Sequence, residues 1–187
     1  MPKKQKIFID NPIASSVDVS TGTAPTPYLV QDGEAVLIFG SVNADLVQPE
    51  LVNESIHPVA TSEGRVAAGF IIADFRSASM GPHSELQFFT LASDQPGEII
   101  GSSPYALPIA MGTRPDWGTL CMRLWNDDTS VLAYNNEYLG LNAEPAVFSH
   151  LDGEDPDNIT FDAKGSDGNP IIKKMLDKVF RNYSIDA

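Results

Sequence analysis

Two apolar runs on either side of a polar turn stand out in the middle of the chain, between residues 65 and 91. The first run, Val66 to Phe75, contains one charged residue, Asp74, and several Val, Phe and Ile residues, as is typical of a strand covered on both faces. The second run alternates between two faces. One face carries Glu85, Gln87 and Phe89, and the other carries Leu86, Phe88 and Thr90. The pattern predicts two buried strands joined at a tight corner. Glu85 then points into any space that its face encloses.

The segments before this strand pair are mixed. Residues 1–27 combine basic, polar and Pro-Thr-Ser-rich stretches, which predict an N-terminal arm that lies over the body or over a neighbouring subunit. We expect residues 28–187 to form a single domain. The pair Asp32-Gly33 between two apolar runs predicts a hairpin turn. Ser41 or Asn43 is expected to cap a helix that Pro49 keeps short.

The second half alternates between irregular and periodic segments. Residues 92–118 contain four prolines and four glycines, and they predict a loop with at most one strand near residues 105–111. A strand over 119–125 and a helix with caps at 126–128 that ends at Gly140 follow, and then candidate strands at 144–151 and 158–165.

A final helix is expected after Asn169, with Pro170 in its first turn and an apolar stripe between Ile171 and Phe180. The whole pattern predicts an α+β fold. Its sheet is expected to be mostly antiparallel, or a partly open β-barrel that encloses a pocket, with a few short helices and a C-terminal helix.

Composition narrows the possible partners. The chain of 187 residues has a formal net charge of −13, so a nucleic acid or an anionic membrane surface would repel it. No apolar run approaches the roughly 20 residues that cross a bilayer, and the first apolar segment is too short for a signal peptide. We therefore expect a cytoplasmic protein. The single cysteine, Cys121, is expected to be a small buried side chain rather than a nucleophile.

Common chemical signatures are missing from the sequence. It has no phosphate-binding glycine loop, no dinucleotide fingerprint and no Gly-x-Ser-x-Gly motif. The three histidines, His57, His83 and His150, are scattered, so a zinc or iron site formed by them with Glu85 is disfavoured. We expect neither a metal nor a cofactor.

Two segments resemble the acetoacetate decarboxylase superfamily. Members of that family carry a Gly-Pro-Tyr-x-Glu segment that enters a strand, and here Gly81-Pro82-His83-Ser84-Glu85 stands in its place. Members also carry Gly-Arg-Glu-x-x-Gly-x-Pro-Lys after a short helix, and residues 135–143 correspond to it, with Glu137 and Gly140 matching. The resemblance covers roughly residues 28–168 and implies the decarboxylase-like fold.

The sequence departs from the family pattern at positions that include the residue that forms the family's covalent intermediate. The family's arginine is Asn136 here, its proline is Asn142, and its Schiff-base lysine is Ala143. The chain has no lysine between Lys6 and Lys164. In the family that lysine forms an iminium with a ketone, so the resemblance implies a member without imine chemistry.

The first functional hypothesis is a cofactor-free acid/base enzyme that acts on a small carbonyl compound or polyketide-like carboxylic acid in a biosynthetic pathway. Decarboxylation, dehydration, cyclisation and isomerisation all remain open. Glu85 would be the general acid/base and Glu137 a second carboxylate that orients substrate or water. An arginine would bind the substrate carboxylate, and the candidates are Arg76, Arg114 and Arg123. The other candidate substrate-binding side chains are His83, Tyr138 and Asn142.

The alternative hypothesis is a non-catalytic small-molecule-binding or scaffold protein on the same fold. In that case Glu85 would be a strand carboxylate paired with Arg76, Glu137 a solvated helix residue, and the tyrosines part of the core. Under either hypothesis the arm and the apolar C-terminal stripe predict a homo-oligomer.

Overall fold

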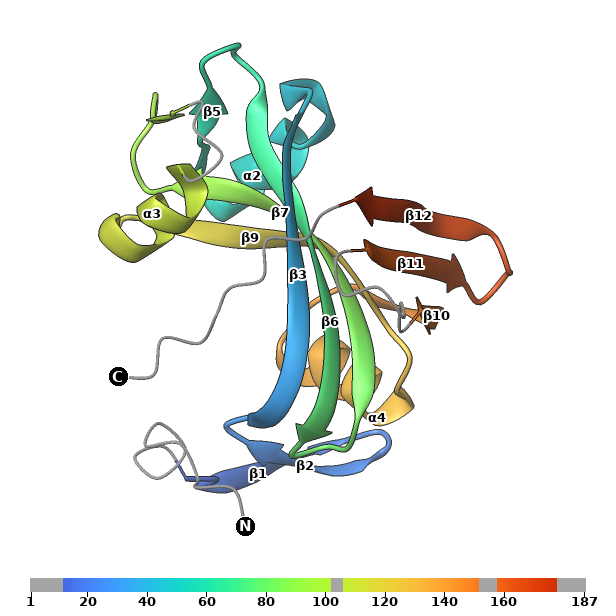
Figure 1. The fold of residues 1–187 in the computed structure, drawn as a ribbon. Helices are drawn as coiled ribbons and strands as arrows, with labels where there is room; N and C mark the ends of the chain where they lie inside the picture. Colours follow the sequence, from blue (N-terminus) through green and yellow to red (C-terminus); the bar gives the residue numbers. More distant parts are fainter. Residues whose placement is uncertain (1–11, 102–105, 152–157, 178–187) are drawn as a thin grey trace, which may run out of the picture.

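A twisted sheet with four long central strands organises the molecule (Figure 1). The computed structural model describes residues 12–101, 106–151 and 158–177. The central strands are β3 (Val30–Val42), β6 (Val66–Ala78), β7 (His83–Ser93) and β9 (Trp117–Asn126). The sheet continues through β10 (Ala143–Leu151), β11 (Asn158–Gly165) and β12 (Pro170–Asp177), and short strands β4 (His57–Pro58), β5 (Ala60–Thr61) and β8 (Ile99–Ile100) extend it at one end.

Most neighbouring strands are antiparallel, but β9 with β10 and β5 with β8 are parallel, so the sheet is mixed. Among the described residues β3 pairs with β6 and β12 pairs with β11, and the two edges do not meet. The sheet is therefore open and strongly twisted. The predicted alternative, a partly open barrel, is not what the described strands form. The predicted pair of buried strands is confirmed by β6 and β7, which pair from Ala68 with Thr90 to Phe75 with His83.

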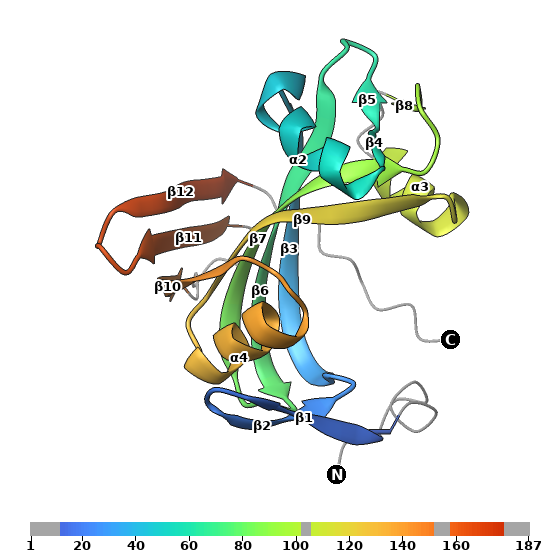
Figure 2. The ribbon, with the colours of Figure 1, turned by 180° about the vertical axis from the view of Figure 1, so that it is seen from behind.

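Short helices lie at the two ends of the long strands (Figures 1 and 2). The upper end carries the 3-10 turn η1 (Ala44–Leu46), α2 (Gln48–Glu54) and α3 (Ala106–Thr113). Figure 2 shows α4 (Thr129–Ala133) in front of the lower half of the sheet, where it continues into a π-helical turn, η2 (Tyr134–Tyr138). Below it lies a separate two-stranded sheet, β1 (Ser15–Val19) with β2 (Gly22–Thr26). Within the described residues, no helix has both the length and the apolar character to cross a membrane.

Strand alternation divides the core between the two faces of the sheet. One face packs Phe89 and Leu91 of β7 against Val59, Ile100 and Leu107. The opposite face packs Leu86 against Phe161 and Ala163 of β11, and a further cluster there packs the strands against α2. Glu85 and Gln87 belong to the first face, because they alternate with Leu86 along β7.

The caps are where the sequence predicts them. The Asn43 side chain accepts a hydrogen bond from the backbone N–H of Asp45 at the start of η1. Asp128 accepts from Ser130 and Val131 at the start of α4, and Gly140 ends that helical segment with a φ of 70°. Local hydrogen bonding of this kind depends on near neighbours in the sequence.

Three predicted elements are wrong. Asp32-Gly33 does not form a hairpin turn, because β3 runs through it with register shifts, and Gly33 packs so closely that an added Cβ would lie 2.8 Å from the Asp74 carbonyl oxygen. The segment expected to be a loop with one strand contains α3 instead.

The expected C-terminal helix is also absent over residues 170–177, which form β12. The preceding turn reverses the chain directly, with backbone hydrogen bonds from Gly168 to Gly165 and from Gly165 to Asn169. Backbone groups after this turn therefore pair with β11 instead of with each other. The last residues of the predicted stripe, 178–180, lie outside the described residues.

Candidate functional site

The carboxyl group of Glu85 is the titratable group that fits a site best. Pairing of β6, β7 and β9 places Ala73, Glu85 and Asn126 in one row across the sheet. The carboxylate accepts hydrogen bonds from Gln87 Nε2 at 3.3 Å and from Asn126 Nδ2 at 3.5 Å. Burial raises the pKa of Glu85 from 4.5 to about 7, and the bond from Asn126 opposes that shift. This carboxyl group therefore changes its charge near neutral pH.

Tyr28, which is half-buried, and His83, which is buried, form a hydrogen-bonded pair beside the site. His83 is only 5% exposed, and its Nδ1 lies 2.9 Å from the carbonyl oxygen of Gly81. A carbonyl oxygen only accepts, so in the neutral ring Nδ1 donates to it and Nε2 accepts from the Tyr28 hydroxyl at 2.9 Å. Burial, with the negative charge of Glu85 next in importance, raises the pKa of Tyr28 well above its usual value. The phenol is thus kept protonated within the electrostatic reach of Glu85.

Cys121 of β9 lies further along the sheet and interacts electrostatically with Glu85. It pairs with Phe89 across the sheet, and its thiol donates to the backbone oxygen of Arg123 at 3.6 Å. Burial and the Glu85 charge raise the pKa of the thiol to about 11. At neutral pH the thiol stays protonated, so it is unsuited to act as a nucleophile. The two side chains that donate hydrogen bonds to Glu85, those of Gln87 and Asn126, are uncharged amides.

Glu137 does not meet Glu85. It is exposed on η2, where its carboxylate accepts hydrogen bonds from the Ser20 backbone N–H at 2.7 Å and from the Ser20 hydroxyl. This contact ties the turn between β1 and β2 to the helix. Asn142 is also exposed, in the loop after η2.

The predicted Tyr138 reaches the site only through a second tyrosine. Its ring is 49% exposed and lies 5.2 Å from the ring of Tyr134, which in turn lies 6.1 Å from Tyr28. Tyr134 is buried, so the three rings run from the surface to the pair that Tyr28 forms with His83.

The three candidate arginines lie apart from Glu85, each in its own ion pairs, which are exposed for Arg76 and Arg123 and partly buried for Arg114. Arg76 binds Asp32 at 2.9 Å and Glu34 at 3.0 Å. Arg123 binds Glu50 at 3.0 Å. Because their guanidinium groups are engaged at the surface, neither is placed to hold a substrate carboxylate beside Glu85.

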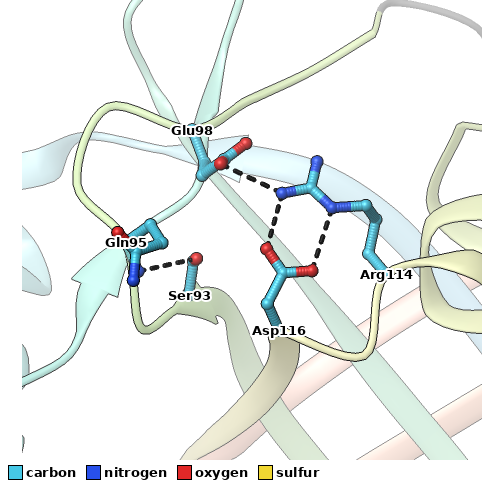
Figure 3. Close-up of polar contacts among 5 residues, drawn as sticks. All are labelled: Ser93, Gln95, Glu98, Arg114 and Asp116. Carbon is cyan, nitrogen blue, oxygen red and sulfur yellow. Dashed lines mark hydrogen bonds and ion pairs between the residues drawn. The ribbon is translucent and has the colours of Figure 1, made fainter.

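Arg114 is held at the other end of the sheet, after α3 (Figure 3). Its guanidinium donates to both carboxylate oxygens of Asp116, at 3.0 and 2.7 Å, and pairs with Glu98 at 3.0 Å. It also lies 4.4 Å from the centre of the Trp117 ring. The hydrogen bond from Arg114 holds the pKa of Asp116 below its usual range. This cluster joins α3 to the strand ends.

Ala143 occupies the position where the family resemblance expects a lysine. It is 7% exposed, at the start of β10, and pairs with Leu124 of β9. The side chain of Asn136 donates to the Ala143 carbonyl at 3.0 Å and accepts from its N–H at 2.6 Å. Both Asn136 and Ala143 therefore serve to attach the end of η2 to the sheet.

A cleft of 310 Å³ opens on the face of the sheet that carries Glu85, nearer to α3. Its walls are mostly apolar and its rim is polar, and Glu85 itself does not line it. The principal wall residues are Phe39, Ala67, Phe89, Leu91, Ile100 and Leu107. Ser41, Ser62 and Glu63 stand at the rim.

Sequence reasoning missed three of the residues around Glu85. Gln87 was accessible from the sequence, because strand alternation already places it on the same face. Asn126 required the pairing between β7 and β9, and Tyr28 required the fold that brings the start of β3 against His83. Among the described residues, no group of three His, Cys, Asp or Glu side chains is arranged to hold a metal ion.

Comparison with known proteins relates the chain by its fold. No protein-family model and no curated protein sequence matches it. A crystal structure of acetoacetate decarboxylase from Legionella pneumophila superposes with a TM-score of 0.54 at 12% sequence identity. The match covers 80% of this chain and 64% of that one, so the chain spans less than two thirds of the neighbour. The fold is thus decarboxylase-like, as the resemblance implied.

Proposed function

We propose that this protein catalyses proton transfer next to the carbonyl group of a small uncharged molecule, with Glu85 as the general acid/base. The observation that supports the proposal best is the half-buried Glu85 carboxyl, whose pKa of about 7 lets it take up and release a proton near neutral pH. Gln87 and Asn126 hold the carboxylate from two sides.

The reaction follows from these groups. The Glu85 carboxylate takes a proton from the carbon next to the carbonyl, the electron pair of that C–H bond forms a C=C bond, and the π pair of the carbonyl moves to its oxygen, which gives an enolate. Tyr28, which stays protonated, can turn its hydroxyl from His83 to that oxygen. If Glu85 swaps its proton with solvent and returns the new one to the same carbon, the result is hydrogen exchange. If it returns a proton to another carbon, the result is an isomerisation.

An uncharged substrate is favoured by the charges around Glu85. Arg76, Arg114 and Arg123 are engaged by surface carboxylates. A substrate carboxylate would place a second negative charge beside Glu85 without a compensating cation among the side chains that the structure describes, which is costly in a partly buried site. Isomerisation, dehydration or cyclisation of a neutral carbonyl compound is therefore favoured over decarboxylation.

The experiment that tests this proposal follows hydrogen exchange in D₂O. Acetone and larger methyl ketones would be incubated with the protein, and deuterium uptake next to the carbonyl would be measured by NMR. We expect exchange above the buffer rate, with a dependence on pH centred near 7. Glu85→Gln should lower the rate by about 100-fold or more, as loss of a general base does. Glu137→Gln is the matched control and should keep the wild-type rate.

A second measurement separates proton transfer from imine chemistry. Borohydride reduction in the presence of a ketone is expected to alkylate the lysines no faster than in the denatured protein and to leave the exchange rate unchanged, because no lysine lies between Lys6 and Lys164. A fast adduct on one lysine that abolishes exchange, or full activity of the Glu85→Gln variant, would overturn the assignment.

The second candidate is a non-catalytic small-molecule-binding protein, favoured by one observation. Glu85 does not line the 310 Å³ cleft, so a ligand can bind there without meeting the acid. Ketone binding with no exchange above buffer in the wild-type protein would establish this second candidate.

A further inference from the structure

The acid and the cleft lie along one strand. Glu85, Gln87, Phe89 and Leu91 are successive residues on one face of β7, and the last two line the cleft. A strand rises about 3.3 Å per residue, so the backbone distance from Glu85 to Phe89 is about 13 Å.

The cleft wall has a built aromatic surface. Gly69 pairs with Phe89, and an added Cβ at Gly69 would lie 2.7 Å from the Phe89 ring, so the missing side chain is what lets that ring lie against β6. Phe39 packs edge-on against the same ring at 5.9 Å. The volume of 310 Å³ is at the lower end of the range for small-molecule pockets.

Between the acid and the cleft, the sheet offers an apolar surface that solvent reaches. The row next to Glu85 consists of Leu37, Ile71 and Gln87 on three adjacent strands. Leu37 is 41% exposed and Phe39, in the next row, is 37% exposed. Burying exposed apolar area under a ligand contributes about 25 cal/mol per Å², so this surface favours an apolar chain.

We propose that the cleft binds the hydrocarbon tail of an aliphatic ketone or aldehyde whose carbonyl end lies at Glu85. With C–C bonds of about 1.5 Å, an extended chain advances about 1.3 Å per bond, so the span corresponds to a tail of about ten carbons beyond the carbonyl carbon. Glu63 at the rim of the cleft disfavours a tail that ends in a carboxylate. The assignment of the carbonyl end rests on the proposed function, whereas tail binding does not.

The test uses the series of methyl ketones from acetone to 2-dodecanone with the full chain. Binding would be followed by NMR, through the methyl signals of Leu91, Ile100 and Leu107 and the side-chain amide of Gln87, in the wild-type protein and in Glu85→Gln. We expect affinity to rise about fourfold per added methylene, as burial of each one predicts. Both sets of signals should shift with 2-dodecanone.

Ser62→Trp places a large ring at the exposed rim of the cleft. It should remove the gain in affinity that each added methylene gives in the wild-type protein. Leu46→Trp is the control, because Leu46 is 72% exposed and lies outside the cleft lining, and it should keep the full dependence.

The outcomes separate the two proposals. Affinity that does not change with chain length, or cleft methyl signals that do not shift, would overturn the tail assignment even if acetone exchanges. Sedimentation that shows a second copy of this chain competing with 2-dodecanone would also overturn it. If tail binding is observed in both proteins but wild type shows no exchange, the proposed function fails and tail binding stands.

Discussion

Asn136 holds both backbone groups of Ala143 through one side-chain amide. The amide N–H donates to the Ala143 carbonyl at 3.0 Å, and its oxygen accepts from the Ala143 N–H at 2.6 Å. These are the positions where the decarboxylase family pattern has an arginine and the reactive lysine. In this chain the two residues form a structural link between η2 and the first residue of β10.

Replacing Asn136 should therefore cost stability. Asn136→Ala removes two hydrogen bonds of about 1 kcal/mol each, so the free energy of unfolding should fall by about 1–2 kcal/mol. Asn136→Asp keeps the acceptor and loses the donor, and it should lie between alanine and wild type. Urea unfolding measures the difference, with the exposed Asn142→Ala as control. Equal losses at Asn136 and Asn142 would contradict the structural link.

The raised pKa of Glu85 predicts how stability depends on pH. Because the folded state binds the Glu85 proton more tightly than the unfolded chain, wild type loses stability as pH rises from 4.5 to about 7. The loss is about 3 kcal/mol at most, at 1.36 kcal/mol per pKa unit. Glu85→Gln lacks this titration, so the stability of the variant relative to wild type should increase over that range and level off above it.

Chemical denaturation at a series of pH values measures that difference, and a ¹³C titration of the Glu85 carboxyl gives its midpoint directly. A midpoint close to 4.5 would remove both the stability effect and the acid/base role.

Tyr28→Phe should destabilise the protein through His83. The variant keeps the ring and removes the hydroxyl that bonds to Nε2 of His83, so a buried nitrogen loses its partner. An unpaired buried polar group costs about 1–3 kcal/mol. Guanidinium unfolding checks the loss against Tyr138→Phe, whose ring is 49% exposed and which should differ little from wild type. If both variants unfold alike, the pair between Tyr28 and His83 contributes nothing.

Gly69→Ala should disturb the cleft and the fold together. The new Cβ would lie 2.4 Å from the Ile38 carbonyl oxygen and 2.7 Å from the Phe89 ring, so backbone or ring must move. Such overpacking costs about 1–3 kcal/mol. Gly118→Ala in β9 is the matched control, because nothing lies within 4 Å of its added Cβ. Thermal unfolding of the two variants compares them, and a neutral Gly69→Ala would show that the strands there separate easily.

Much of the local structure was predictable from the sequence because it depends on near neighbours. The alternation of β7 placed Glu85 with Gln87, and a hydrogen bond of 3.3 Å between their side chains confirms it. The cap at Asp128 and the end at Gly140 are local in the same sense. The Asp32-Gly33 turn failed because pairing of β3 with β6 continued through it, which no local pattern reveals.

The sequence by itself determined that Glu85 lies on one face of a buried strand, and that the position of the family's lysine is an alanine. Only the tertiary structure decided what each charged side chain meets. Glu137 contacts Ser20, 117 residues away, and the arginines pair with surface carboxylates instead of gathering at Glu85. The physical reason is range: alternation and capping act over a few residues, whereas a side chain's partner and its burial depend on where distant segments fold back.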